Sequence, residues 1–153
     1  MSQEHQEQTD QQERNITFVK DLYAAFGRGD LPYILERFAP QLEEFGVTAN
    51  GSARAPWHIT TTTRQGVARY FELLLGALEP VQFEPRHFAA GGDHVYATID
   101  HSYRVRSNGK ILPMKNGIHR FKVKGGLVVA WSAAEDTLLT METLGAAAMR
   151  AAG

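Results

Sequence analysis

The chain has 153 residues, 43% of them hydrophobic and 22% charged, with 16 Lys and Arg against 17 Asp and Glu. This length predicts one domain that buries a core without help from metals or disulfides. A net charge of −1 offers no basic surface for nucleic acid, and the lack of cysteine excludes disulfides, thiolate metal sites and cysteine nucleophiles. The sequence has neither a membrane-length apolar run nor a signal-peptide pattern, so we expect a cytoplasmic protein.

The first half of the chain carries helical signals. A polar segment with five Gln and three Glu cannot bury enough surface to offset its ordering entropy, so we predict a flexible tail over residues 1–15, with an extension of the first helix as the alternative. Apolar residues then recur at helical spacing after Asn15, Asp30 and Thr63, three residues suited to capping a helix. Between the second and third helices we expect an irregular stretch with one short strand over residues 43–48.

The second half changes to the alternating pattern of strands. Turns are predicted at Gly91-Gly92, Asn108-Gly109 and Gly125-Gly126, because such pairs are typical of tight hairpins. A helix–helix–strand–helix start followed by a meander predicts an α+β fold, with helices packed on one face of a curved antiparallel sheet. An Ala-rich helical tail is expected at the end. The predicted strands span residues 81–90, 94–106, 111–124 and 127–137.

The last hairpin indicates which side chains share a face. A two-residue turn at Gly125-Gly126 places His119 opposite Ser132, on a face rich in small residues. Such a face lines a ligand cavity or accommodates a closely packed helix, and the sequence does not separate the two. Further along, Lys115 lies opposite Asp136, either to orient a polar ligand or as a surface salt bridge. The other face carries Leu127, Val129 and Trp131.

The preceding hairpin leaves the position of a second histidine open. Pairing across Asn108-Gly109 places His101 on the opposite parity from His119. A β-bulge near Gly117 would restore the parity and bring His101 and Tyr103 to the face of His119. Without the bulge, both would be exposed cross-strand residues.

Three segments are similar to a known superfamily. Its helical start resembles residues 23–40 (YAAFGRGDLPYILERFAP), its third helix residues 63–74 (TRQGVARYFELL), and its last hairpin residues 121–145 (FKVKGGLVVAWSAAEDTLLTMETLG). The chain thus resembles the SnoaL-like, ketosteroid-isomerase-like members of the nuclear-transport-factor-2-like superfamily over residues 16–146. Residues 147–153 remain as a C-terminal tail.

The resemblance implies a cone-shaped sheet in ααβαβββ-type order, with three N-terminal helices on its concave face and a pocket between them. It also implies a homodimer through the outer sheet face, which would cover Leu127, Val129 and Trp131. No single activity follows, because this fold hosts isomerases, cyclases, dehydratases, epoxide hydrolases and non-catalytic domains.

The acids of the best-known relatives are absent at the matching positions. The base of the ketosteroid isomerases aligns with Gly46, and their second acid and the acid of the cyclases align with Gly117. Their tyrosine aligns with Leu22, one residue before Tyr23. We therefore do not expect isomerase or aldol-type cyclase activity by those known mechanisms.

Two other residues are candidates for catalysis. Glu44 lies two positions before Gly46 and is expected to point inward, where a carboxylate can act as a base. His119 is expected on the pocket floor, where it can transfer protons near neutral pH. The alternatives are a solvated strand edge for Glu44 and a hydrogen-bonded core histidine for His119. Candidate ligand-binding residues are Tyr23, Trp57, His58, His101, Tyr103, Gly117, Ser132 and Asp136.

The six histidines show no metal-ligand spacing and the chain has no cofactor motif, so we expect neither metal nor cofactor. The first functional hypothesis is proton transfer on a small apolar or carbonyl-containing molecule, of the isomerase, cyclase or dehydratase type, with Glu44 and His119. The second is a non-catalytic module that binds a small molecule or forms a dimeric interaction surface. The sequence does not decide whether the chain is an enzyme.

Overall fold

The computed structural model describes residues 2–47 and 55–152, with residues 146–152 described by their backbone alone. A single curved sheet has the strand order β1-β5-β4-β3-β2. Its strands are β1 (Glu44–Gly46), β2 (Leu78–Gly91), β3 (His94–Val105), β4 (Ile111–Lys124) and β5 (Leu127–Ala134). The helices are α1 (Gln3–Gly27), α2 (Leu31–Glu36), α3 (Arg64–Ala77) and α4 (Thr137–Ala152).

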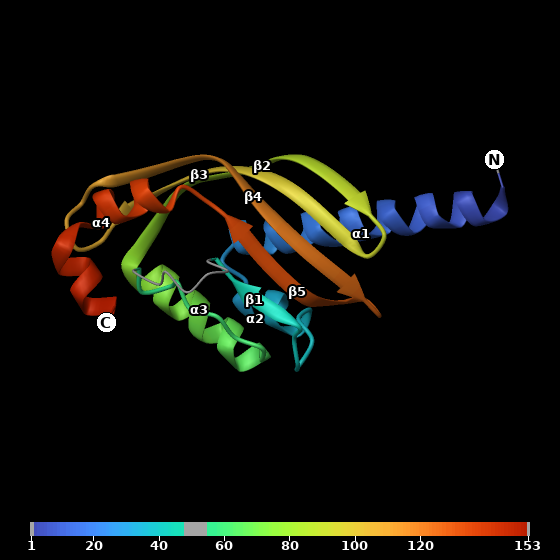
Figure 1. Ribbon diagram of the computed structural model, residues 1–153, viewed down its shortest axis with the longest axis horizontal. Coiled ribbons are helices and arrows are strands. Elements are labelled where there is room, and N and C mark those ends of the chain that lie inside the picture. Colours follow the sequence, from blue (N-terminus) through green and yellow to red (C-terminus); the bar gives the residue numbers. More distant parts are fainter. Residues whose placement is uncertain (1, 48–54, 153) are drawn as a thin grey trace.

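The sheet curves over the three N-terminal helices, and α4 lies at one end of the long strands (Figure 1). Helix α1 packs against β2 and β3, and α3 packs against β2 and α2. The predicted α+β fold with helices on the concave face is confirmed. One strand differs from the expected antiparallel pattern, because β1 pairs with β5 in parallel.

The caps of two helices lie where the sequence predicts them. Asp30 Oδ1 accepts a hydrogen bond from the Tyr33 backbone N–H at 3.2 Å, and Thr63 Oγ1 accepts one from Gly66 N–H at 3.0 Å. Each bond satisfies a backbone donor at a helix start that has no partner within the helix.

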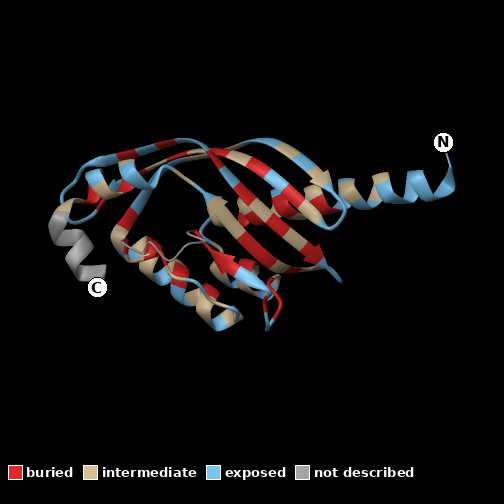
Figure 2. Cartoon of the chain, viewed as in Figure 1, coloured by how far each residue is buried: buried red, intermediate tan, exposed pale blue. Residues whose placement is uncertain are grey.

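Helix α1 begins much earlier than predicted. Its N-cap is Ser2, and Asn15 is a buried residue inside the helix rather than a cap. Hydrogen bonds between side chains four residues apart, such as Gln6 to Asp10 at 2.9 Å, support the helix ahead of its packed half. The segment predicted to be a flexible tail is therefore helical from Gln3, and its first turns are exposed (Figure 2).

The β4–β5 hairpin contains a bulge that the sequence analysis does not predict. Val123 pairs with Val128 as expected, but Lys122 pairs with Ala130, which leaves Val129 as the extra residue. Because side chains alternate along a strand, one extra residue moves every later side chain of β5 to the opposite face. Trp131 therefore faces the helices and is only 6% exposed.

The β3–β4 hairpin contains the bulge that the sequence predicts. Ile99 pairs with Gly117 but His101 pairs with Met114, so that β4 carries an extra residue between the two pairs. Asn116 adopts a left-handed conformation there (φ 56°), and its N–H donates to Asp100 Oδ1 at 2.9 Å. This bulge places His101 on the same concave face as His119.

Candidate functional site

A cavity of about 70 Å³ lies between the concave face of the sheet and the helices. Among the described residues, its one acidic lining residue is Glu135, and no Lys or Arg contributes to the lining. Most of the other lining residues are aromatic. They are Tyr23, Phe26, Phe38, Phe45, Tyr70, Phe71, Phe83, Tyr103, Phe121 and Trp131, with Leu22, Ile34, Leu74, His101 and His119.

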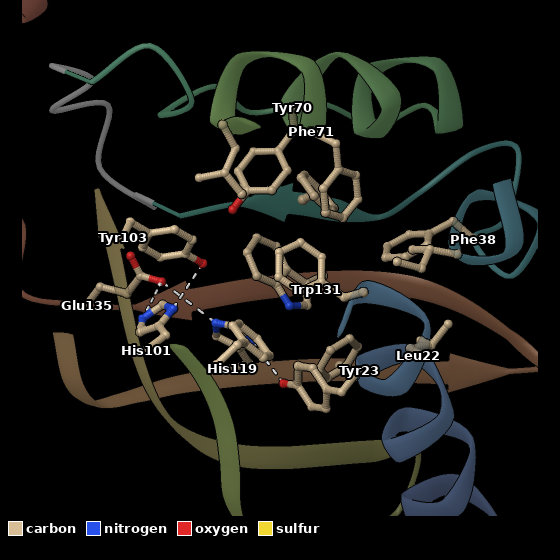
Figure 3. A pocket seen from close by; sticks show the side chains of 16 residues that line it. Leu22, Tyr23, Phe38, Tyr70, Phe71, His101, Tyr103, His119, Trp131 and Glu135 are labelled. Carbon is tan, nitrogen blue, oxygen red and sulfur yellow. Dashed lines mark hydrogen bonds and ion pairs between the residues drawn. The ribbon is translucent and has the colours of Figure 1, made fainter. Parts of the chain in front are cut away.

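Glu135 faces both His101 and His119 at one end of this cavity (Figure 3). One carboxylate oxygen, Oε1, is 3.7 Å from Nε2 of His101 and 3.7 Å from Nε2 of His119. All three side chains are at least nine-tenths buried. Glu135 directly follows β5 and continues the alternation of Trp131, so the bulge at Val129 is what turns it inward.

Each histidine also contacts a tyrosine. His119 Nδ1 is 2.9 Å from the hydroxyl of Tyr23 on α1, and His101 Nδ1 is 3.2 Å from the hydroxyl of Tyr103 on its own strand. Two tyrosine–histidine arms thus converge on one oxygen of Glu135 (Figure 3). Polar side chains from the first helix, two strands and the end of a third strand meet there in an otherwise apolar cavity.

The ionisation of the cluster follows from its surroundings. Burial acts to raise the pKa of Glu135, but contact with His119 and the charges of the nearby histidines outweigh it and hold that pKa below its usual value. Burial lowers the pKa of His101, an effect that the charge of Glu135 opposes. Burial also raises the pKa of the Tyr23 and Tyr103 hydroxyls well above the usual range. At neutral pH we therefore expect an ionised carboxylate, a neutral His101 and protonated tyrosines.

These charges indicate the tautomer of each histidine. An ionised carboxylate only accepts hydrogen bonds, so the Nε2 atoms facing Glu135 are assigned as N–H donors. The Nδ1 atoms then accept from the tyrosine hydroxyls. At 3.7 Å the Nε2–H groups are too far from Glu135 for good hydrogen bonds, and Nε2 of His101 is buried without a partner. The Nε2–H group of His101 is therefore free to bind an oxygen atom of a ligand, and Nε2 of His119 lies at the same distance from Glu135 Oε1.

Tyr70 brings a further hydroxyl to the cavity from α3, opposite the sheet (Figure 3). Burial raises the pKa of its hydroxyl, and the charge of Glu135 raises it further, so it stays protonated as a donor. Its ring packs against Phe45 and Trp131, with centroid distances of 5.1 and 5.7 Å.

Glu44 does not lie where the sequence analysis places it. Its side chain is 48% exposed and forms an ion pair with Arg120. Phe45 is the residue of β1 that points into the cavity, while a Cβ at Gly46 would meet Thr60 at 3.0 Å. The expected Glu44–His119 pair is wrong, because Glu44 and Gly46 face away from the helices.

Two other predicted residues also lie outside the cavity. Ser132 faces outward after the bulge, and its hydroxyl accepts a hydrogen bond from Arg120 Nε at 3.1 Å. Asp136 is exposed and caps α4, where Oδ1 accepts from Leu139 N–H at 3.0 Å. The predicted contact between Asp136 and Lys115 is replaced by this cap.

Trp57 and His58, two of the predicted ligand-binding residues, are buried and do not line the cavity. Trp57 is almost fully buried and does not line the cavity. His58 Nδ1 has no hydrogen-bond partner. Burial lowers the pKa of His58, and the charge of Glu135 acts in the opposite direction.

Gly117 makes room for the cluster. A Cβ at this position would lie 3.5 Å from His101 Nε2 and 3.8 Å from Cγ of Glu135. A long side chain there would occupy the space in which Glu135 lies. The carboxylate of this chain thus enters the cavity from the end of the neighbouring strand β5.

Four residues predicted from the sequence to bind a ligand do line the cavity: Tyr23, His101, Tyr103 and His119. Glu135 and Tyr70 also line it but are not predicted from the sequence. The apolar run Leu127–Trp131 breaks strict alternation, and this is the one local signal of a bulge that would have brought Glu135 inward.

The SnoaL-like domain model matches residues 19–131, about three quarters of the chain. The chain belongs to the SnoaL-like domain family. No match was found among the curated proteins compared with this SnoaL-like protein.

Solved structures share the fold. An NTF2-like protein from Burkholderia thailandensis is 24% identical, with 86% of this chain and 98% of that chain covered and a TM-score of 0.75. TerC co-crystallized with polyporic acid is 21% identical, with coverage of 85% and 97% and a TM-score of 0.73. An LEH-like epoxide hydrolase from M. tuberculosis is 12% identical, with coverage of 88% and 91% and a TM-score of 0.68. Sequence identities this low show a shared fold and nothing about function.

Two structural features are absent from residues 2–47 and 55–152. No helix there is long and apolar enough to cross a membrane. No group of three His, Asp or Glu side chains there is arranged to hold a metal ion.

Proposed function

We propose that this SnoaL-like protein is an enzyme that transfers a proton on a small, largely apolar carbonyl compound. The observation that carries the proposal is the placement of one carboxylate oxygen of Glu135 at 3.7 Å from the Nε2 atoms of both His101 and His119, inside an aromatic cavity. Buried, perturbed ionisable groups in a cavity are typical of catalytic sites.

The roles follow from the charges. Glu135, ionised at neutral pH, accepts the proton from the carbon next to the carbonyl. The Nε2–H groups of His101 and His119 donate to the carbonyl oxygen and stabilise the negative charge that develops on it. Tyr23 and Tyr103 hold the two imidazole rings in the required tautomer. The proton then returns from Glu135 to the substrate at the same or a conjugated carbon, which gives an isomerase-type reaction.

Hydrogen exchange in D₂O tests this proposal without knowledge of the natural substrate. Phenylacetone and 2-butanone are incubated with the protein, and loss of the α-hydrogen signal is followed by ¹H NMR. We expect faster exchange than in buffer, and Glu135→Gln should lower the enzymatic rate by about 100-fold or more. The matched control is Asp136→Asn, because Asp136 is an exposed helix cap and Asn caps helices equally well.

A second function is supported by the glycines at positions 46 and 117, where related enzymes carry acids. It is non-catalytic binding of a small molecule in the same cavity. Ketone binding with an exchange rate equal to that of buffer would reject the enzyme and favour this alternative. TerC, a protein of the same architecture, was co-crystallized with polyporic acid.

A further inference from the structure

A groove on the surface adjoins the cavity at the end of α1 and the start of β2. Phe26 and Phe83 line both spaces. Their rings are in contact, with centroids 4.8 Å apart, and both residues are half-buried. The two rings therefore form the wall that separates the groove from the cavity.

The two spaces differ greatly in size. The cavity holds about 70 Å³, whereas the groove holds about 500 Å³. A single water needs roughly 10–15 Å³ by this kind of measure, so the cavity accommodates only a small head group. Typical ligand sites are several times larger, with about 300–1,000 Å³. A ligand of ordinary size thus needs space beyond the cavity, and the groove lies directly behind the Phe26 and Phe83 rings that line both spaces.

The groove has an apolar, uncharged lining. Among the described residues that line it there is no Asp, Glu, Lys or Arg, and the polar side chain is that of Gln82. Val81, which is 54% exposed, lies in it and is among the most exposed large apolar residues of the structure. The remaining lining residues are Gly27, Gly29, Leu31, Leu75 and Pro80.

We propose that the ligand is an elongated molecule whose polar head lies at Glu135 and whose apolar tail passes between Phe26 and Phe83 into this groove. The Phe83 ring also packs against Tyr23 and His101, with centroid distances of 5.6 and 5.7 Å. A tail that displaces Phe83 therefore passes directly beside the polar cluster. Rotation of the two half-buried rings opens the passage, a motion that side chains make rapidly. This inference rests on the proposed function, because it uses the same head-group site.

A homologous series of methyl ketones, from 2-butanone to 2-decanone, tests the groove. Affinities are measured by titration while the backbone amide signals are followed by ¹H–¹⁵N NMR. We expect affinity to rise about fourfold per added methylene once the chain passes the two rings, which corresponds to about 0.8 kcal/mol per buried methylene. The amides of Gly27 and Gly29 should shift with the long ketones only.

Two matched variants separate the groove from non-specific binding. Val81→Glu places a charge in the groove and should flatten the dependence of affinity on chain length. Ile111→Glu places the same charge on a residue that is 42% exposed and outside the groove, and the dependence should persist. Equal behaviour of the two variants, or a flat series in the wild-type protein, would overturn the tail site.

Failure of the groove and failure of the head site give different results. If 2-butanone binds, and Glu135→Gln abolishes this binding or the hydrogen exchange, the head site stands even where chain length has no effect. If 2-butanone does not bind to the wild-type protein, the head site fails and the tail proposal fails with it.

Discussion

The hydroxyl of Tyr23 lies 2.9 Å from Nδ1 of His119, so that the first helix holds a histidine of the sheet in position. Replacing Tyr23 with Phe keeps the ring but removes this hydrogen bond. A typical hydrogen bond contributes about 0.5–1.5 kcal/mol, so we expect kcat for α-hydrogen exchange to fall by roughly 2- to 12-fold with little change in KM. Tyr103→Phe tests the corresponding contact between Tyr103 and His101 in the same assay. Unchanged kcat in both variants would reject the positioning role of the tyrosines.

The stability of the protein should fall in acid. Burial lowers the pKa of His58 and of His101 in the folded state, so the unfolded chain takes up protons at about pH 6.5 before the folded chain does. The free energy of unfolding should therefore decrease as the pH falls below about 6.5 and level off above it. Glu135, whose folded-state pKa is also lowered, should add a further loss below about pH 4.5.

Urea unfolding between pH 7.5 and 5 measures this dependence. His58→Gln removes one of the two buried histidines. It should reduce the slope of the free energy of unfolding against pH by the equivalent of up to one bound proton. His87→Gln changes an exposed histidine of β2, and the wild-type slope should persist. A slope that is the same in both variants and the wild type would exclude His58 as a source of the acid sensitivity.

Two glycines of α3 should respond oppositely to alanine. A Cβ at Gly66 would lie 1.7 Å from the Thr61 hydroxyl oxygen, whereas a Cβ at Gly76 would meet nothing within 4 Å. Gly76→Ala should stabilise the protein by about 0.4–1 kcal/mol, because alanine lowers the entropy of the unfolded chain. Gly66→Ala should destabilise it by about 1–3 kcal/mol through the clash. Denaturant unfolding of the two variants checks both signs, and a stabilised Gly66→Ala would contradict the close approach of Thr61.

The homodimer expected from the family stays a prediction, but its contact residues change. Trp131 faces the cavity and cannot be part of an outer interface. The outer face instead exposes Tyr96 on β3 and Ile118 on β4, which are 43% and 46% exposed. We expect a dimer by light scattering, which Ile118→Glu should convert to a monomer while Leu138→Glu on α4 does not. A wild-type monomer would reject this interface.

Local chemistry made much of the fold predictable. The caps at Asp30 and Thr63 and the turn at Gly125-Gly126 depend on neighbouring residues alone, and the structure has all three. Because Gly117 is unusual in the middle of a strand, it also marked the bulge that brings His101 to the side of His119.

The bulge at Val129 could not be predicted in the same way. Leu127, Val128 and Val129 are all apolar. The hairpin would therefore bury an apolar side chain with or without the bulge, and the local sequence does not favour one register over the other. Tertiary packing selects the register, because Trp131 packs against Phe45 with ring centroids 4.7 Å apart. Phe45 is distant in sequence, so the broken alternation of Leu127–Trp131 hints at a bulge but does not fix which register forms.

Val129 also affects how this chain can be compared with its relatives. A relative that lacks this one residue would present Ala134 or Asp136, rather than Glu135, to the cavity if the rest of its hairpin were the same. A sequence alignment would then pair residues whose side chains lie on opposite faces of the sheet. In this family, insertions and deletions within the last hairpin can therefore reassign the reactive groups without a single substitution. Catalytic residues there should be matched by the direction in which they point.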